Sequence, residues 1–158
     1  YRDRSNKQNT IEDEDPWVVS EVVEALGRSG SHLVVEELFR MVEHHSPAVV
    51  IATLQALARL CPLGIEKIID TGLAHSDSEV VVEAMSVLRC LQRDQAGERL
   101  LAAMKHASWD VRLAAAEMAQ RRRIVISRAA LDELLEAERE VIVRAAFEEL
   151  EPLVESGE

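Results

Sequence analysis

The stretch Ser108-Trp109-Asp110-Val111-Arg112-Leu113-Ala114-Ala115-Ala116-Glu117-Met118-Ala119 decides the fold. It predicts a helix, because serine is a preferred N-cap and most of the residues that follow are good helix formers. Its apolar side chains lie three, seven, eight and eleven positions past Ser108, which places them on one face. A helix this short is marginal alone in water, so it must pack against similar neighbours.

The same pattern recurs along the chain every 31 residues. Its anchors are Asp15, Ser46, Asp77, Ser108 and Arg139. The first four are residue types that cap helices, and Pro16 and Pro47 stand where a helix loses nothing to proline. Three positions past the anchors, the core stripe begins with Val18, Val49, Val80, Val111 and Ile142. Copies held in register over this length indicate a repeat architecture.

A second helix is expected before each copy after the first. The expected spans are roughly Ser31 to His44, Gly64 to His75, Gln95 to His106 and Ser127 to Ala137, with Leu38, Ile69, Leu100 and Leu131 in their cores. Breakers are expected between pairs at 27–30, 61–64, 93–94 and 121–123. The sequence therefore predicts an all-α fold, a solenoid of stacked antiparallel helix pairs over 15–158 with about four and a half repeats. Residues 1–14, polar and rich in acidic side chains, are expected to be a linker or disordered tail.

The run Asp110-Val111-Arg112-Leu113-Ala114-Ala115-Ala116 resembles the inner helix of a HEAT repeat, in the short form of phycobilisome-lyase-type HEAT-like repeats. The resemblance covers residues 15 to about 154 and implies a right-handed, armadillo-like superhelix that serves as a scaffold or binds partners. In that family the Asp and Arg tie neighbouring repeats together. Here the arginine position of the other copies holds Val19, Val50, Val81 and Val143, which suggests aliphatic packing.

Composition narrows the classes of function. Hydrophobic residues make up 47% of the chain but aromatic residues only 3%, so the core must be aliphatic. A net charge of −11 disfavours nucleic-acid binding and polybasic membrane contact. No apolar run approaches the roughly 18 residues of a membrane span. The two cysteines, Cys61 and Cys90, are expected to be reduced thiols of a cytoplasmic protein. Since the chain opens at Tyr1, we expect a fragment of a longer array.

Three histidines also follow the repeat: His44, His75 and His106. We expect each to act as a cation near the carbonyls that end a helix. A shared metal ion is disfavoured, because neighbouring helices lie about 8–10 Å apart whereas zinc ligands lie about 2 Å from the ion. Nucleophile elbows, phosphate-binding glycine loops and Cys-x-x-Cys motifs are absent from the sequence. The sequence therefore predicts a non-enzymatic protein with no catalytic residue, metal or cofactor.

The surface opposite the core stripe is the candidate site. The predicted contact residues on this concave face are Glu21, Glu24, Ile51, Val82, Glu83, Leu113 and Glu117. Its aliphatic members would form a partly exposed strip flanked by carboxylates, which favours a basic peptide or protein. The alternative is that packing between repeats buries the strip. Trp17 and Trp109 are further candidates for partner contact.

The leading functional prediction is a scaffold that binds a protein or peptide on this concave face. A different class of function is an accessory or chaperone-type subunit of a tetrapyrrole (bilin) lyase. A third is a DNA-binding module that uses a rim of Arg28, Arg59 and Arg121. A fourth is a structural segment whose lone first helix leaves an apolar side open for self-association.

Overall fold

In the computed structural model, which describes residues 15–29 and 34–154, the chain is all-helical. Its α-helices are α1 (Pro16–Ser29), α2 (Val35–Met41), α3 (Pro47–Leu60), α4 (Ile65–Leu73), α5 (Ser78–Val87), α6 (Arg93–Ala103), α7 (Trp109–Arg122), α8 (Arg128–Ala137) and α9 (Val141–Glu148). Two short 3-10 helices follow α5 and α9: η2 (Leu88–Cys90) and η3 (Glu151–Leu153). The all-α prediction is therefore confirmed for the described residues. The predicted tail, 1–14, lies outside them.

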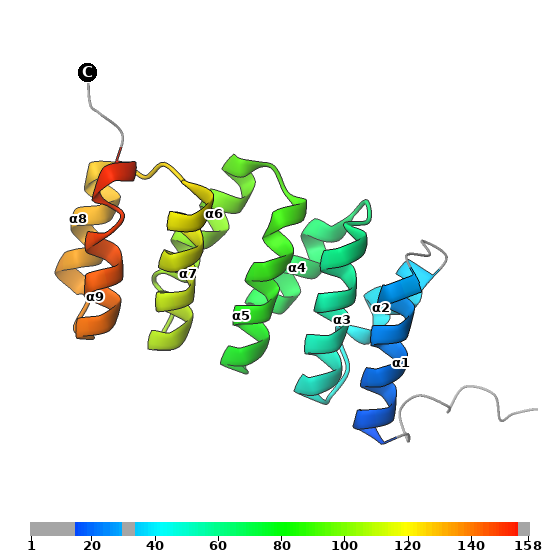
Figure 1. The fold of residues 1–158 in the computed structure, drawn as a ribbon. Helices are drawn as coiled ribbons and strands as arrows, with labels where there is room; N and C mark the ends of the chain where they lie inside the picture. The colour runs from blue at the N-terminus through cyan, green and yellow to red at the C-terminus, as the bar shows by residue number, and fades with distance from the viewer. Residues whose placement is uncertain (1–14, 30–33, 155–158) are drawn as a thin grey trace, which may run out of the picture.

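The helices form two layers, which Figure 1 shows from the side of the odd-numbered helices. Helices α1, α3, α5, α7 and α9 stand side by side and run in the same direction, and each packs against the next. Each even-numbered helix lies behind and packs on the odd helix that follows it in the chain. The core fills the space between the layers, where the predicted residues Leu38, Ile69, Leu100 and Leu131 are fully buried.

The odd helices begin at regular positions, with one shift at the end. Helices α1, α3, α5 and α7 start 31 residues apart, whereas α9 starts at Val141, 32 residues after Trp109. The extra residue rotates α9, so that Val143 is fully buried and Ile142 is 56% exposed. The predicted core role of Ile142 is therefore wrong. Val18 is also exposed, because no described helix precedes α1 to cover it.

Helix starts are capped by two kinds of contact. The carboxylates of Asp15 and Asp77 accept hydrogen bonds from the backbone amides two residues on, at 3.0 and 2.9 Å, as capping predicts. The side chains of Ser46 and Ser108 occupy N-cap positions but make no such bond. The predicted cap is therefore right for the aspartates and wrong for these serines.

The three periodic histidines accept the backbone amides of the residues that precede α3, α5 and α7. In His44, His75 and His106 the ring Nδ1 accepts the backbone N–H of the residue two positions later, at 3.0 Å in each case. A ring nitrogen accepts a hydrogen bond only when it carries no proton, so the imidazoles act as acceptors here. The predicted role, a cation beside helix carbonyls, is corrected by this geometry.

Close approach between α1 and α3 depends on a glycine. Gly27, predicted to break the chain between helices, lies inside α1 and is buried. A Cβ added at Gly27 would stand 2.6 Å from the Cβ of Ala56, so the two backbones pass too closely for any side chain. Arg93 and Asp94, also predicted as a breaker, open α6 instead.

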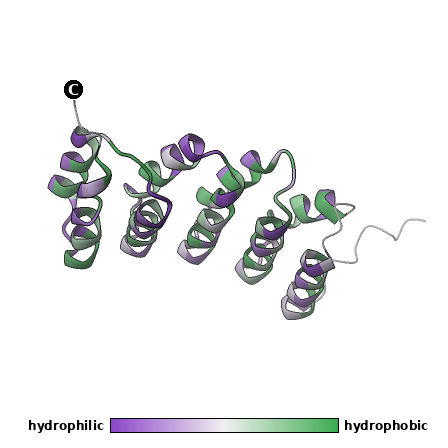
Figure 2. Ribbon diagram, turned by 45° about the horizontal axis from the view of Figure 1, so that its top comes forward, coloured by the Kyte–Doolittle hydropathy of each residue, from purple (hydrophilic) through white to green (hydrophobic). Residues whose placement is uncertain are grey.

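The linker between α7 and α8 is hydrophobic, as its green colour in Figure 2 shows. Ile124 and Ile126 are each 4% exposed, whereas Val125 between them is 54% exposed. Ile126 also forms an isolated parallel bridge with Val154. The linker is thus part of the core and presents one aliphatic side chain to solvent.

Candidate functional site

The predicted apolar strip lies across three neighbouring helices. Ile51, Val82 and Leu113 are each the fifth residue of their helices, α3, α5 and α7, which pack side by side. All three are half-buried and pack against the core. The strip is therefore partly exposed, as one prediction states, and packing between repeats does not cover it fully.

Two predicted carboxylates on this face are already paired within their own helices. Glu24 in α1 lies 3.0 Å from the guanidinium of Arg28, and Glu117 in α7 lies 3.7 Å from that of Arg121. Both pairs have the i, i+4 spacing that suits an exposed helix surface. Because these pairs are exposed, each adds little stability, but each neutralises a charge on the face.

The other two carboxylates, of Glu83 and Glu21, differ in whether they have hydrogen-bond partners. Glu83 in α5 accepts hydrogen bonds from the amide of Gln55 at 3.2 Å and from the hydroxyl of Ser86 at 2.8 Å, so it links α3 to α5. Glu21 in α1 is exposed, and no described side chain pairs with it. The excess negative charge of the face is therefore small, which weakens the reason for expecting a basic partner.

The two tryptophans stand at the N-terminal ends of their helices. Trp17 in α1 is 69% exposed and Trp109 in α7 is 49% exposed. Aromatic side chains are rare in this chain and are strong contact residues in interfaces. Their exposure keeps both tryptophans as candidate partner contacts.

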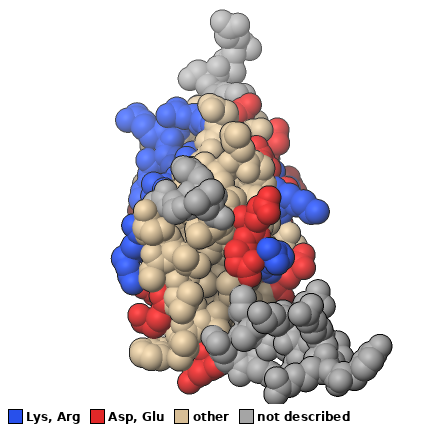
Figure 3. Space-filling view, turned by 90° about the vertical axis from the view of Figure 1, so that its right-hand side faces the viewer, with Lys and Arg blue, Asp and Glu red and all other residues tan. Residues whose placement is uncertain are grey.

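Arginines gather at the opposite end of the odd helices. We name this surface the arginine edge; it consists of Arg28, Arg59, Arg89, Arg93, Arg121, Arg122 and Arg123. They lie at the ends of α1, α3, η2 and α7 and at the first residue of α6. Figure 3, viewed from the α1 end, shows basic side chains gathered at the upper left. The predicted rim of three arginines is therefore only part of a larger cluster.

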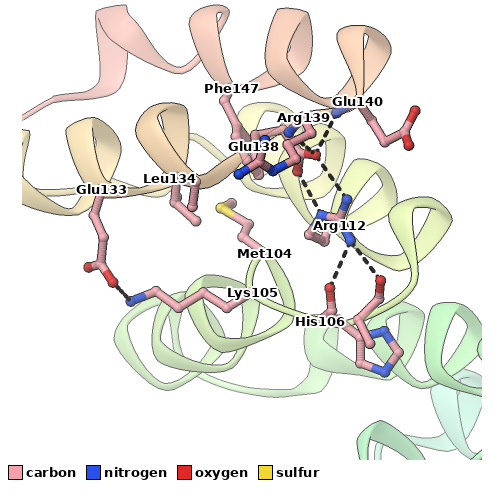
Figure 4. A pocket seen from close by; sticks show the side chains of 12 residues that line it. Met104, Lys105, His106, Arg112, Glu133, Leu134, Glu138, Arg139, Glu140 and Phe147 are labelled. Carbon is pink, nitrogen blue, oxygen red and sulfur yellow. Dashed lines mark hydrogen bonds and ion pairs between the residues drawn. The ribbon is translucent and has the colours of Figure 1, made fainter.

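A cleft of about 500 Å³ opens between α6, α7, α8 and α9. Figure 4 shows its side chains: Met104, Leu134 and Phe147 supply apolar surface. Lys105 and Glu133 form an exposed ion pair at 2.8 Å beside it. Sequence reasoning did not single out this cleft.

The cleft holds the most buried ion pair among the described residues. Arg112 in α7 donates two hydrogen bonds to the carboxylate of Glu138, at 2.6 and 2.9 Å, and further bonds to the backbone carbonyls of His106 and Ala107. The side chain of Glu138 is only 3% exposed. The Arg112 guanidinium, together with the amides of Arg139 and Glu140, lowers the pKa of Glu138 from 4.5 to about 2.

Asp110, two residues before Arg112, also links two of the odd helices. Asp110 accepts hydrogen bonds from the hydroxyls of Ser108, in its own turn, and of Ser78, at the start of α5. These bonds and the amide of Val111 lower the pKa of Asp110. Asp110 therefore links α7 to the start of α5, and Arg112 links α7 to Glu138 at the end of α8.

Arg112 replaces an aliphatic residue of the repeat. The valines at the same position of α1, α3 and α5, Val19, Val50 and Val81, are between 0 and 3% exposed, which confirms aliphatic packing there. Val143, predicted to share this position, takes the place of Val111 instead, because of the extra residue before α9. Glu138 likewise takes the place of the periodic histidines, because it accepts the amide two residues on at 2.9 Å. Sequence reasoning missed Glu138; its signal was a position 32 residues after His106, matching the shifted start of α9.

The two cysteines are joined, so the prediction of reduced thiols is wrong. Cys61 follows α3 and Cys90 ends η2, and the two form a disulfide with Cα atoms 5.2 Å apart. The sequence signal was their place near the same end of consecutive odd helices. The disulfide links α3 to η2 within the arginine edge.

The outer side of α1 leaves aliphatic surface open. Val18 and Val22 are 42% and 51% exposed, although the equivalent residues of the inner copies are buried. Figure 3 shows a largely uncharged band over this end of the array, between basic and acidic groups. Val18 and Val22 therefore form an exposed apolar face on α1.

Two classes of site have no counterpart in residues 15–29 and 34–154. No three His, Cys, Asp or Glu side chains there converge as a metal site would require. Within the same part of the chain, no helix has both the length and the apolar character needed to cross a bilayer. No family model and no curated protein matches the chain.

Proposed function

We propose that the protein is a right-handed α-solenoid of HEAT-like repeats with a 31-residue period, and that it acts as a non-enzymatic scaffold. In this proposal it binds a protein or peptide on the concave face of α1, α3, α5 and α7. Successive odd helices pack directly on one another, whereas the even helices mainly contact the odd layer. This difference supports a curved arrangement with the odd helices on the concave side.

The half-exposed strip of Ile51, Val82 and Leu113 is the observation that carries the proposal. If these aliphatic side chains served only the core, they would be fully buried. If their position faced only solvent, polar side chains would be expected there. Since most carboxylates of the face have partners, the strip rather than charge supplies the affinity. The partner therefore presents aliphatic or aromatic side chains, with basic groups reaching Glu21 and Glu83, whose hydrogen-bond partners are uncharged.

A peptide-display selection tests the proposal. Peptides selected on the folded protein should bind the wild type at least about tenfold more tightly than the Val82→Arg/Leu113→Arg variant, since each loses an apolar contact and meets a charge. The control is Thr71→Arg/Ala129→Arg, which adds the same charge to exposed positions of α4 and α8. If selected peptides bind the strip variant and the control equally well, the concave face is not the site.

A second copy of the chain is a further proposed partner, through Val18 and Val22 on α1. Sedimentation at high concentration should show a dimer that a Val22→Asp variant lacks, because a buried carboxylate would cost more than the contact gains. A monomer at all concentrations would discard this proposal.

Two expectations from the sequence stay predictions. The cytoplasmic location is untested, and the disulfide is more typical of oxidising compartments. The accessory role in bilin attachment is also untested, and an absorbance titration with a bilin would detect or discard it.

A further inference from the structure

We propose that the arginine edge is a second binding site, for an acidic peptide segment that carries an aliphatic side chain. The site lies at the C-terminal ends of the odd helices and does not use the concave strip. It therefore goes beyond the scaffold function proposed above and can be tested separately.

Unpaired charge is the first argument. Arg28 and Arg121 have carboxylate partners, but within the described residues the other five members of the arginine edge have none. Elsewhere in the described residues most arginines have carboxylate partners, and Arg139 is the exception: Arg99 binds Asp70 at 2.7 Å and Arg128 binds Glu151 at 2.6 Å. In a chain with 29 acidic and 18 basic residues, unpaired arginines gathered at one edge are placed to bind an external anion.

Helix capping does not account for the cluster. Basic residues are favourable at helix C-termini, which explains Arg59 and Arg121. Arg93, however, is the first residue of α6, where the helix dipole disfavours a cation. Burial, and to a smaller extent the charge of nearby Arg93, lowers the pKa of Arg122, and the Nη1 of Arg122 is buried without a hydrogen-bond partner. Two like charges held together without a counter-ion are expected to bind an anion.

Spacing indicates an extended peptide. Neighbouring packed helices lie about 8–10 Å apart, so that successive arginines such as Arg28 and Arg59 step by about that distance. In an extended polyproline II peptide three residues make one turn, cover about 9 Å and place every third side chain on the same side. An extended peptide with a carboxylate at every third residue therefore matches one arginine per repeat, whereas duplex DNA offers a charge about every 1.7 Å.

An apolar cleft at the end of the row supplies the aliphatic contact. It has a volume of about 600 Å³ and is lined by Leu101, Ile124, Val125 and Ile126, with Arg93 at its margin. Asp94 and Glu98 also line it, on the α6 side, so an uncharged side chain is favoured inside the cleft. The carboxylates of the ligand then contact the arginines outside it.

Nucleic acid fits this edge less well. Single-stranded nucleic acids bind by stacking bases on aromatic side chains, and the edge as described carries none. The exposed tryptophans, Trp17 and Trp109, stand at the opposite ends of their helices. The net charge of −11 also repels a polyphosphate more strongly than a short peptide with spaced carboxylates.

Fluorescence anisotropy with defined probes tests the proposal. The main probe is a labelled peptide of about 12 residues, long enough for four helices, with glutamate at every third position and leucine near both ends. The comparison probes replace leucine by serine, replace glutamate by lysine, or are a single-stranded oligo-dT of the same length. We expect binding of the main probe, weakened at least about tenfold between about 50 and 300 mM salt. No binding of the main probe at low salt would overturn the proposal.

Charge reversal locates the site. Arg59→Glu/Arg89→Glu should weaken the main probe at least about tenfold, because two attractive contacts become repulsive. The control, Lys67→Glu/Arg139→Glu, changes the net charge equally at exposed basic residues that lack carboxylate partners, and should change affinity less than about twofold. Equal weakening by both variants would overturn the assignment to this edge.

Two further outcomes concern the identity of the ligand. The serine-substituted peptide and a Val125→Asp variant should each bind at least about fivefold more weakly, because the cleft loses its apolar contact. Unchanged affinity in both would remove the aliphatic requirement and overturn the proposal. Tighter binding of oligo-dT than of the main probe would replace the acidic peptide by a nucleic acid.

Discussion

Replacing Arg112 with valine removes one half of the buried ion pair that joins α7 to the turn before α9. Glu138, whose side chain is 3% exposed in the folded protein, would lose two charge-assisted hydrogen bonds, of 2.6 and 2.9 Å. Breaking a buried pair on one side costs about 3–5 kcal/mol, because the remaining charge is uncompensated. We therefore expect Arg112→Val to lower the free energy of unfolding by about that amount at neutral pH.

The pKa of Glu138 provides a second measure of the same interaction. A shift from 4.5 to about 2 corresponds to about 3.4 kcal/mol at about 1.4 kcal/mol per unit. Because the pKa is lowered by folding, this stabilisation is fully present above the unfolded value and is lost as the pH falls through the folded value. At about pH 3 only about 1.4 kcal/mol of it remains. The deficit of Arg112→Val should shrink accordingly between pH 5 and 3.

A double variant tests whether the cost comes from the unpaired carboxylate. Arg112→Val/Glu138→His reproduces the combination of Val81 and His106 found one repeat earlier. The new histidine can accept the amide of Glu140 as His106 accepts that of Ser108. Since replacing a buried ion pair by a less polar pair is often neutral, we expect the double variant within about 1 kcal/mol of the wild type.

Urea unfolding followed by circular dichroism at about pH 7, 5 and 3 measures these differences. The control is Arg121→Val in the same helix, which breaks an exposed pair and should cost less than about 1 kcal/mol. The reasoning is refuted if Arg112→Val costs no more than the control, or if its deficit is the same at pH 7 and pH 3.

Two other perturbations give further predictions. Gly27→Ala should destabilise the protein by about 1–3 kcal/mol through contact with Ala56, despite the helix preference for alanine. A Cβ at Gly97 would stand 3.0 Å from the Cγ2 of Ile124, the end of a side chain, so Gly97→Ala should change the stability by less than about 1 kcal/mol. Urea unfolding of both variants decides this, and equal stabilities would contradict it. Reducing the disulfide between Cys61 and Cys90 should lower the unfolding free energy by about 3–4 kcal/mol, since the disulfide closes a loop of about 30 residues. Urea unfolding with and without dithiothreitol checks this. An unchanged midpoint would show that the disulfide does not constrain the unfolded chain.

The helical core could be predicted from sequence wherever a helix has neighbours on both sides. Val49, Val80 and Val111 share one position of the stripe, and all three are fully buried. The residue at this position is not buried in α1 or in α9, for two different reasons. Val18 has no described helix to cover it, and Ile142 is displaced by one extra residue in the turn around Glu138. A fixed spacing carries no information about such an insertion or about a missing neighbour.

The chemistry of the candidate site could be predicted only in part. The pairing of Glu24 with Arg28 follows from their spacing of four residues, with the glutamate nearer the N-terminus. The pairing of Arg112 with Glu138 does not, because the two are 26 residues apart and meet only when α9 packs on α7. The disulfide depends likewise on the packing of α3 against η2, which separate residues cannot reveal.

The polar links between repeats bear on how the two proposed surfaces would act. Successive repeats are joined by the pairs Arg99–Asp70, Lys105–Glu133 and Arg112–Glu138 and by the disulfide. None of these links uses the strip residues Val82 or Leu113, so a partner can contact the strip without breaking them. Bending or twisting the array, however, would change the distances across several links together. We therefore expect the spacing between repeats to stay nearly constant on binding, so that each surface selects ligands whose contact groups repeat at the distance between neighbouring helices.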